Sequence, residues 1–443
     1  MKQKRKFKQT EIGLIPEDWN VDNLGNSVIK IFVGRDPAGG KQSHSDEKTN
    51  YAIIQSAPVF DGFLDREKVG HVSEEIYADF TSASLVKEDV LLNQLGDGIT
   101  FARSCVVPND ILPAIITRSV GCIRCDRKKL DPWFLNAFLI LPKTKEYIES
   151  FNSGSSRRAI DGAKMRSFLI PLPPLSEQKM IGHSYKILQD KIELNKKMSK
   201  TLEATGQAIF KRWFINFEFP NEKGKPYKSS GGEMVESELG EIPKGWQISR
   251  ISEEATIKGG STPSTENSEY WDGELYWCTP KDLSKLTFPV LLKTERKITQ
   301  KGLDSIASGL LPKNSLLLSS RAPIGYLAIS QIETAINQGF IGIICNKKLS
   351  SMFMLWWVKN NLDAIKNMAN GSTFQEINKS DFRIIKILVP KSEVLQLFDI
   401  VVSSVFNKII ENEKESQNLS QIRDSLLPRI MSGKIRVPVE VRT

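Results

Sequence analysis

The sequence predicts a mixed α/β (α+β) fold built twice, as two pseudo-symmetric domains separated by an antiparallel pair of long coiled-coil helices. Three observations lead to this prediction: an internal repeat, short apolar runs alternating with helical patterns in each half, and two long helical segments with matching apolar stripes. The 443 residues are 40% hydrophobic and 26% charged, which suits two to three soluble domains of ordinary size.

The repeat is clearest at the ends of each half. Residues 10–21 read TEIGLIPEDWNV and residues 237–248 read SELGEIPKGWQI, so Trp19 and Trp246 are equivalent. Later in each half, Gly154-Ser155 matches Gly371-Ser372. The frame of one half therefore recurs in the other.

The interiors of the halves are only loosely alike. The alignment that we predict there matches residues 91–98 with 316–323 and residues 114–123 with 335–344. A matched frame around an unlike interior indicates one scaffold that presents two different surfaces. Drift of a duplicated domain without new specificity would produce the same pattern.

Each interior combines strand and helix patterns. Short apolar runs bounded by Gly, Pro, Asn and Asp, such as YAIIQSAPV and FIGIIC, are typical of strands. DPWFLNAFLILPKTKEYIESF and SMFMLWWVKNNLDAIKNM carry apolar residues at helical spacing. We predict mixed α/β domains over residues 10–175 and 237–391.

Two long helices are predicted over residues 176–214 and 392–432, with a Pro-, Gly- and Ser-rich linker over residues 215–236. At about 1.5 Å per residue, each helix would be on the order of 50 Å long. A long helix with a narrow apolar stripe needs a partner, and the equivalent stripe in the other half is the obvious one. The predicted pairing positions are Ile181, Leu188, Ile192, Asn195, Leu202, Phe398, Val405, Ile409, Asn412 and Leu419. The two asparagines either fix the register within the stripe or point to solvent.

The charge balance favours a polyanionic partner. Lys and Arg number 61 against 52 Asp and Glu, which gives a net charge of +9. Five cysteines, an odd number spread through a long chain, predict reduced thiols and a cytoplasmic location. No apolar run is long enough to cross a bilayer, and no secretory signal follows the basic start.

Motifs for catalysis are mostly missing from the sequence. It contains no GxxxxGK[ST] and no HExxH. Asp131-Pro132-Trp133-Phe134 resembles the [DNS]PP[YFW] loop of adenine methyltransferases but lacks the second proline, so we interpret it as a helix start. Cys122 and Cys125 form a CxxC without a second pair, in what we predict to be a strand. We therefore predict no catalytic residue and no metal site, with a self-contained DNA methyltransferase or nuclease, or a scaffold that touches no DNA, as alternatives.

The order of the motifs resembles that of a known family. TEIGLIPEDW, GSSRRAI, IPLPPLSEQ and a long helix are followed by SELGEIPKGW, GSTFQEI, LVPKSE and a second long helix ending in LLPRIMSGKIRV. This pattern is similar to the specificity (S) subunit of type I restriction–modification systems, over nearly the whole chain. Recognition subunits of some type II (combined methylase/nuclease) systems share these pieces and are the alternative.

The resemblance implies a non-catalytic subunit that recognises double-stranded DNA. Each α/β domain would be a target recognition domain that reads one half of a bipartite site, and the helices would set the gap. The helices would also dock two modification (methyltransferase) subunits, which restriction (motor/nuclease) subunits join. The chain itself would hold no cofactor; S-adenosylmethionine, ATP and Mg²⁺ are expected on the partner subunits.

Candidate DNA-binding residues lie in loops rich in Gly, Ser, Thr and basic side chains. Arg and Gln can each contact a guanine or adenine edge with two hydrogen bonds. A solvated surface charge is the alternative for any one of them. The candidates are Arg35, Arg103, Arg118, Arg157 and Arg158 in the first half, and Lys258, Ser261, Thr262, Lys281, Arg321 and Gln338 in the second.

Overall fold

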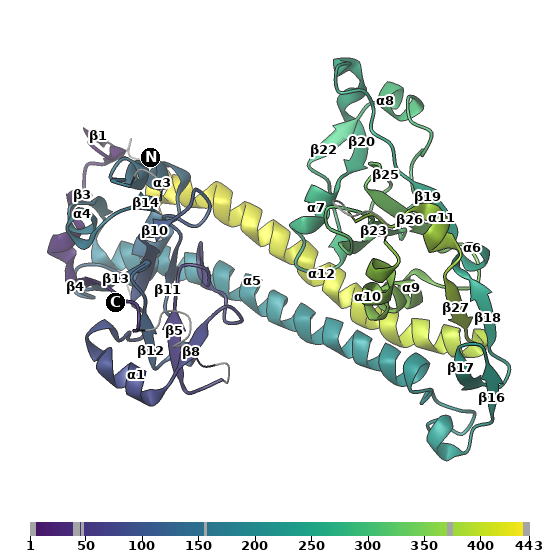
Figure 1. Ribbon diagram of the computed structural model, residues 1–443. Helices are drawn as coiled ribbons and strands as arrows, with labels where there is room; N and C mark the ends of the chain where they lie inside the picture. The colour runs from purple at the N-terminus through teal and green to yellow at the C-terminus, as the bar shows by residue number, and fades with distance from the viewer. Residues whose placement is uncertain (1–5, 39–44, 46–47, 155–156, 370–374, 437–443) are drawn as a thin grey trace, which may run out of the picture. The chain divides into compact units, whose positions relative to one another are not determined.

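The computed structural model describes residues 6–38, 45, 48–154, 157–369 and 375–436. The chain forms two compact units, one of residues 1–194 with 416–443 and one of residues 195–415. Each unit is a mixed α/β domain joined to segments of two long helices, which confirms the predicted fold class (Figure 1). The repeat residues Ser155, Gly371 and Ser372 lie outside the described residues.

The first unit contains a four-stranded sheet of order β11-β9-β13-β4 and a three-stranded sheet of order β12-β5-β8. Its strands are β1 (Phe7–Thr10), β2 (Gly13–Pro16), β3 (Asn20–Asn23), β4 (Val28–Val33), β5 (Tyr51–Ile54), β6 (Val59–Phe60), β7 (Phe63–Leu64), β8 (Gly70–Val72), β9 (Val90–Asn93), β10 (Leu95–Gly96), β11 (Ser104–Val106), β12 (Ala114–Ile116), β13 (Val120–Cys125), β14 (Arg158–Ala159) and β15 (Leu169–Leu172). Its short helices are α1 (Glu74–Asp79), α2 (Pro132–Leu139), α3 (Pro142–Glu149) and α4 (Gly162–Arg166).

The predicted helix start at DPWF is confirmed, because the Asp131 side chain accepts a hydrogen bond from Phe134 N and Pro132 opens α2.

The second unit contains a five-stranded sheet of order β19-β26-β23-β24-β21 and a three-stranded sheet of order β22-β20-β25. Its strands are β16 (Met234–Ser237), β17 (Gly240–Pro243), β18 (Gln247–Arg250), β19 (Thr256–Gly259), β20 (Trp271–Cys278), β21 (Val290–Leu291), β22 (Arg296–Ile298), β23 (Leu316–Ser319), β24 (Leu327–Ser330), β25 (Thr334–Ile336), β26 (Phe340–Ile344) and β27 (Lys386–Val389). Its short helices are α6 (Ile251–Glu254), α7 (Pro280–Ser284), α8 (Gln300–Asp304), α9 (Ser351–Asn360), α10 (Leu362–Asn367) and α11 (Lys379–Arg383).

Strand register fixes which residues of the two units correspond. Asn93 in β9 lies opposite Val120 in β13, and Ser319 in β23 lies opposite Phe340 in β26. Leu91 and Leu317 both face the second-largest buried cluster of their unit, whereas their sequence neighbours face the largest. Because side chains alternate between the faces of a strand, a shift of one residue would turn each of these side chains toward the other cluster.

The predicted alignment of the interiors is therefore wrong by one residue. Leu91 corresponds to Leu317 rather than Leu316, and Val120 corresponds to Phe340 rather than Ile341. The error has a simple cause. Runs of Leu and Ile match one another equally well in neighbouring registers, and the alternation of buried faces shows only in the folded chain.

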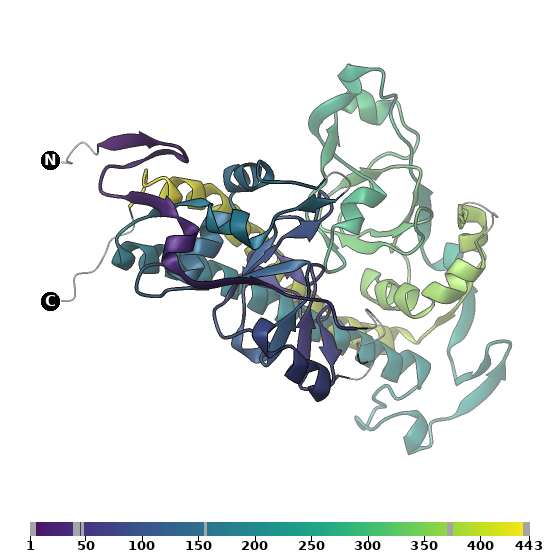
Figure 2. The same cartoon turned by 60° about the vertical axis from the view of Figure 1, so that its left-hand side comes forward.

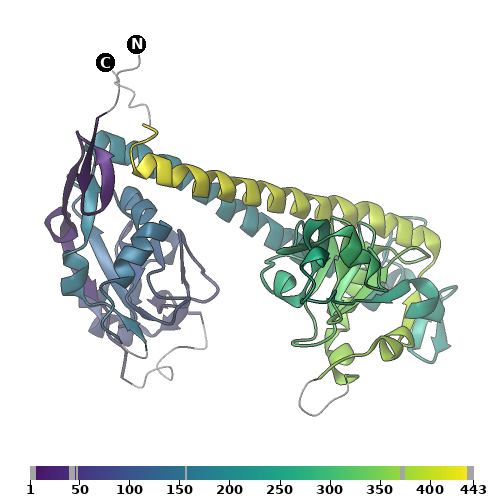
Figure 3. The same ribbon diagram turned by 90° about the horizontal axis from the view of Figure 1, so that it is seen from above.

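The two long helices are α5 (Leu175–Phe210), which continues as a π-helical turn over Lys211–Ile215, and α12 (Ser392–Met431) (Figures 1 and 3). In the second unit the Phe210 and Phe398 rings are 6.1 Å apart. In the first unit Arg423 donates to Gln189 Oε1 at 3.0 Å. Late residues of one helix thus meet early residues of the other, which is the antiparallel sense.

Among the described residues, none of the helices combines the length and apolar character that crossing a membrane demands.

The predicted pairing positions fall into two groups. Ile181, Asn195, Phe398, Ile409 and Asn412 are buried. The other five are half-buried: Leu188, Ile192, Leu202, Val405 and Leu419. The structure thus places both asparagines inside the stripe rather than in solvent.

The asparagines form a polar layer in the second unit. Asn195 Nδ2 donates to Glu415 Oε2 at 2.8 Å and approaches the carbonyl oxygen of Asn412 at 3.5 Å. Asn412 Nδ2 donates to Ser199 Oγ at 3.2 Å. A buried amide needs these partners, so sliding one helix along the other would leave polar groups unpaired. The layer therefore favours a single register.

The predicted linker is packed against the second unit. The Phe219 side chain is buried and stacks between Tyr227, at 4.5 Å, and Trp246, at 5.1 Å. The composition of this segment indicated a connection between domains, but it gave no sign that one aromatic residue would anchor it on the repeated tryptophan.

A corresponding contact in the first unit is ionic. After α12, the chain returns to the β1–β2 hairpin, as Figure 2 shows in yellow and purple. Arg436 NH2 donates to Asp18 Oδ2 at 2.9 Å and to Glu177 Oε2 at 2.6 Å. Glu177 is buried and accepts from Trp19 Nε1 at 3.2 Å. We call Asp18, Trp19, Glu177 and Arg436 the terminal clasp.

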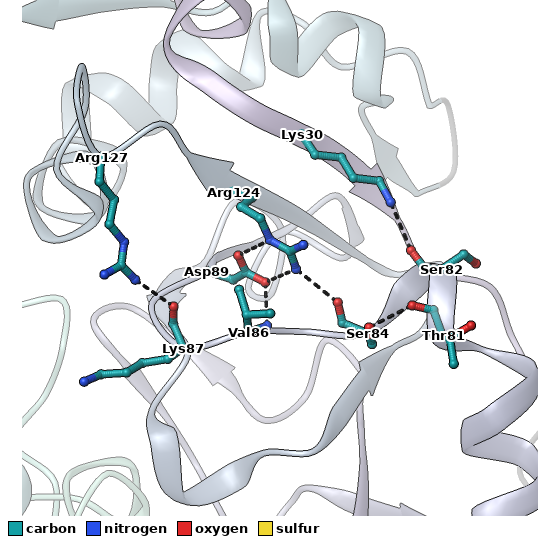
Figure 4. A network of polar contacts seen from close by, with 9 residues as sticks. All are labelled: Lys30, Thr81, Ser82, Ser84, Val86, Lys87, Asp89, Arg124 and Arg127. Atoms are coloured by element: carbon teal, nitrogen blue, oxygen red, sulfur yellow. Dashed lines mark hydrogen bonds and ion pairs between the residues drawn. The ribbon is translucent and has the colours of Figure 1, made fainter.

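A second buried ion pair braces the sheet of the first unit (Figure 4). Arg124 in β13 donates to both carboxylate oxygens of Asp89, at 2.9 and 2.8 Å, and to the carbonyl oxygen of Ser84 at 3.1 Å. Asp89 also accepts from Val86 N at 2.9 Å. These bonds satisfy a carboxylate that is 1% exposed and fix the segment that leads into β9.

Helix pairing in the second unit makes a direct prediction. Leu202 packs against the main core of that unit, so Leu202→Asp should bury a charge and lower the free energy of unfolding by about 2–3 kcal/mol. Ala208→Asp, at an exposed position of the same helix, should change it by about 0.5 kcal/mol or less. Urea unfolding followed by circular dichroism measures both. Equal effects of the two variants would contradict the pairing.

The terminal clasp predicts a pH-dependent contribution to stability. The hydrogen bond from Arg436 holds the pKa of Asp18 below its ordinary value of 3.8. Because the pKa is lower in the folded state, this contribution is present above pH 3.8 and is lost as the pH falls through the folded pKa.

Arg436→Ala should remove that dependence, and it should also cost about 3–5 kcal/mol by leaving the buried Glu177 carboxylate without its ion partner. Thermal unfolding between pH 3 and 7 measures both effects. Arg429→Ala, at an exposed position in the last turn of α12, is the control. A pH profile of the Arg436→Ala variant that matches the wild-type profile would refute the role of the clasp.

Candidate nucleic-acid interface

The first unit brings two of the predicted arginines to one cleft of about 470 Å³. Arg118 and Arg157 line it together with Ser56, Leu95, Gly96, Asp97, Thr100 and Ser119. Leu95 and Gly96 belong to β10, which pairs with β14 so that Gly96 lies opposite Arg158. Arg118 comes from the turn between β12 and β13. Residues far apart in the sequence thus share one exposed, basic concavity.

Arg118 is held at the edge of this cleft by a neighbouring loop. Its Nε lies 2.7 Å from Asp36 Oδ2, although the side chain remains 73% exposed. The backbone is fixed as well, since the Arg118 carbonyl oxygen accepts from Gln94 Nε2 at 2.6 Å. An arginine that is oriented but still exposed can contact an external acceptor with little loss of side-chain entropy.

A glycine lets the Asp36 loop approach this closely. A Cβ on Gly34 would overlap the carbonyl oxygen of Ile116, at the end of β12. In the second unit, a Cβ on Gly260 would overlap the carbonyl oxygen of Asn337, just after β25. Each glycine opens a Gly-x-x-Pro loop, Gly34-Arg-Asp-Pro37 or Gly260-Ser-Thr-Pro263, and both prolines are buried. The two loops therefore occupy the same place in the two domains.

The equivalent loop of the second unit makes the equivalent contact. Thr262 donates a hydrogen bond to the side chain of Gln338, which is exposed. Two indole groups anchor the backbone of this loop. Trp277 Nε1 donates to the Ser261 carbonyl oxygen at 3.1 Å, and Trp271 Nε1 donates to the Ser264 carbonyl oxygen at 3.0 Å. Arg296 covers the Trp271 ring at 3.5 Å.

Arg321 and Lys281 lie near the same turn. A Cβ on Gly339 would be 3.8 Å from Arg321 Cγ and 3.2 Å from Pro280 Cγ, the residue before Lys281. Arg321 faces Glu376 at 3.6 Å, and Lys281 faces Glu295 at 3.1 Å. Both cations are thus partly compensated by carboxylates on exposed surface, where such pairs contribute little to stability.

The remaining candidates lie elsewhere. Arg35 donates to the Asp79 carbonyl oxygen at 2.6 Å, at the end of α1, and Arg103 covers the Phe60 ring at 4.6 Å. Arg158 pairs with Glu149 at 2.6 Å, and Lys258 is exposed on β19. None of these four lines the Arg118 cleft, although Arg158 pairs in the sheet with Gly96, which does. Which candidates touch DNA remains a prediction.

Sequence reasoning missed the residues that hold the candidates in place. Asp36, Trp271, Trp277 and Arg296 position loops or side chains, and none was a candidate. A signal existed for the first of them. The Gly-x-x-Pro pattern recurs in both halves, but the surrounding residues differ too much to show that the loops correspond.

The CxxC residues take part in packing. Cys122 and Cys125 lie in β13 and are buried, and burial raises the pKa of both thiols. Within the described residues, no group of three or more His, Cys, Asp or Glu side chains is arranged to hold a metal ion.

Two copies of one domain, with unlike polar side chains at matched loop positions, define a protein with two related but different recognition surfaces. Comparison with known proteins identifies its family. Residues 16–204 and 243–421 match the family model of the type I restriction modification DNA specificity domain, and the chain belongs to this family.

The relatives agree with this assignment. The specificity subunit of type I restriction enzyme MjaIX from Methanocaldococcus jannaschii is 37% identical over 189 residues, 42% of this chain and 44% of that protein. The putative MjaX specificity subunit of the same organism is 26% identical over 97% of both chains. The HindI specificity subunit of Haemophilus influenzae is 25% identical over 80% of this chain and 87% of that protein.

A solved structure supports the fold. The type I restriction-modification S subunit from M. genitalium superposes with a TM-score of 0.60, at 13% identity, over 97% of this chain and 99% of that chain. The predicted family is therefore confirmed, and the type II alternative is not favoured.

The Gly-x-x-Pro loops make a prediction about stability. Gly34→Ala and Gly260→Ala should each lower the free energy of unfolding by about 1–3 kcal/mol, because the added methyl group meets backbone that cannot rotate away. Gly162→Ala is the control, since its Cβ would be 3.9 Å from Ile31 Cγ2, an ordinary contact. Urea unfolding of the three variants tests this. A wild-type midpoint for both loop variants would show that the loops do not depend on a glycine there.

Proposed function

We propose that each α/β domain reads one half of a bipartite site in double-stranded DNA. The observation that carries this proposal is the unlike chemistry at matched positions: Asp36 with Arg118 in one domain, Thr262 with Gln338 in the other. Phosphate contacts position a protein and can be the same in both domains, whereas base contacts specify sequence and must differ between half-sites.

The net charge of +9 supports DNA as the partner, because each cation set against a phosphate releases counterions. Arg118 and Arg157 line one cleft, and arginine side chains can contact both base edges and phosphates. The relatives are named as specificity subunits of type I restriction enzymes, which fits a chain that selects DNA sequence.

We further propose that the paired helices α5 and α12 set the gap between the half-sites and dock two modification subunits. A paired helix is a stiff element, and the polar layer at Asn195 and Asn412 favours one register. In this scheme the partner subunits supply S-adenosylmethionine binding, adenine methylation and the ATP- and Mg²⁺-dependent restriction activity, in the cytoplasm. This chain contributes recognition and no catalysis.

Mapping methylated adenines tests the proposal. The full chain is expressed with its modification subunit in a host free of other adenine methylation. We expect one asymmetric motif made of two short specific segments separated by a fixed, unspecified gap. A continuous motif, or methylation without sequence preference, would contradict two separate reading domains.

A second measurement tests the division of labour. Purified chain alone is incubated with labelled S-adenosylmethionine and DNA, beside the chain assembled with its modification subunit. Methyl transfer should require the assembly. DNA binding should weaken steeply with salt, with a log–log slope of several units. Methyl transfer by the isolated chain would favour a self-contained methyltransferase, and salt-independent behaviour would favour a scaffold that touches no DNA.

A further inference from the structure

Arg118 and Gln338 occupy the same position in their two domains. Each lies in a four-residue turn closed by one hydrogen bond: Val120 N to the Thr117 carbonyl oxygen at 3.0 Å, and Phe340 N to that of Asn337 at 3.3 Å. Each turn follows the edge strand of a parallel pair: β12, which pairs with β5, and β25, which pairs with β20.

The start of each turn is fixed in the same way. Thr117 N donates to the Ile54 carbonyl oxygen at 3.0 Å, and Asn337 N donates to that of Cys278 at 3.0 Å. Ile54 and Cys278 are the last residues of β5 and β20. The second residue of the turn is Arg118 in one domain and Gln338 in the other, so the correspondence rests on backbone geometry and not on sequence likeness.

The loop residues that contact Arg118 and Gln338 also differ between the two domains. The third residue of the Gly-x-x-Pro loop is Asp36 opposite Arg118 and Thr262 opposite Gln338. A carboxylate suits a guanidinium, and a hydroxyl suits an amide. If these positions only had to be polar, the contacting residue in the other loop would have no reason to differ as well.

We propose that Arg118 and Gln338 are specificity-determining residues that read the same relative base pair in the two half-sites, Arg118 selecting guanine and Gln338 selecting adenine. This inference rests on the proposed function. Asp36 and Thr262 act as positioning residues, each orienting the reading side chain from the loop beside it.

The chemistry of the contacts supports these assignments. Asp36 approaches Arg118 at Nε, so the two terminal nitrogens can form the fork that matches guanine O6 and N7. Thr262 donates to Gln338 Oε1, which has a second lone pair, and Nε2 keeps both of its hydrogens. The amide can then accept from adenine N6 and donate to adenine N7. Both side chains are exposed, as a base-reading group must be before DNA binds.

A reciprocal exchange tests the inference. One variant of the full chain carries D36T and R118Q, and the other carries T262D and Q338R. Each is assembled with the modification subunit, and bound DNA is selected from a library in which both half-sites are randomised. We expect one G·C pair of the first half-site to become A·T in the first variant. One A·T pair of the second half-site should become G·C in the other variant.

The half-site of the untouched domain and the gap length should stay the same in both exchanges. Arg118→Lys provides a milder variant, because lysine keeps the charge but lacks the planar fork. It should lose about tenfold or more of the preference for guanine at one base pair while the complex still binds DNA. Arg127→Gln, an exposed first-unit position that pairs with Glu88 and does not line the cleft, is the matched control.

Several outcomes would overturn the inference. Unchanged preferences in both exchanges, or full guanine preference in Arg118→Lys, would exclude these residues as base readers. A uniform loss of affinity over all sequences with a shallower salt slope would make Arg118 a phosphate contact instead. Failure of the wild-type complex to enrich any bipartite site would instead count against the proposed function itself.

Discussion

The structure depends on the exchange of helix segments between the two halves of the chain. The core of the first unit contains Ile181 and Tyr185 from α5 together with Leu427 and Met431 from α12, and the core of the second contains Phe210 from α5 together with Phe398 and Phe406 from α12. Neither half of the sequence supplies both contributions to its own core. Loss of helix pairing would therefore expose apolar surface in both domains, which links the integrity of each recognition surface to the same two helices.

The polar contacts at the helices select one arrangement among many apolar ones. Leu, Ile and Val side chains pack almost as well after a shift of one heptad, so they stabilise pairing without fixing where it stops. The contacts of Asn195 with Glu415 and of Asn412 with Ser199 do not survive such a shift. Gln189 with Arg423 adds the same kind of constraint in the first unit. Burying these amides lowers the stability of the helix pair, but it specifies a single register.

The architecture could be predicted from the sequence, but the arrangement of the residues at the candidate site could not. The repeated IPxxW motif, the strand and helix patterns and the two stripes predicted both domains and the pairing, because these features depend on the period of apolar residues. The alignment of the interiors was one residue out, since runs such as LLN and LLLS have no unique register. That single residue decides whether Arg118 corresponds to Gly339 or to Gln338. Contacts such as Asp36 with Arg118 join positions whose meeting depends on the complete sheet, so no local pattern could reveal them.

The two domains illustrate how a duplicated scaffold can acquire two specificities. The close approach of a glycine loop to the end of a strand is the same in both, and it involves backbone atoms that any sequence provides. The side chains that this approach brings together are exposed, so replacing them costs little folding stability. An ion pair in one domain and a neutral hydrogen bond in the other are then alternative solutions on one frame. Substitutions where the loop and the turn meet therefore have little effect on folding stability, whereas substitutions at the glycine or in the buried strands destabilise the domain. Such a division lets recognition diverge while the fold stays fixed.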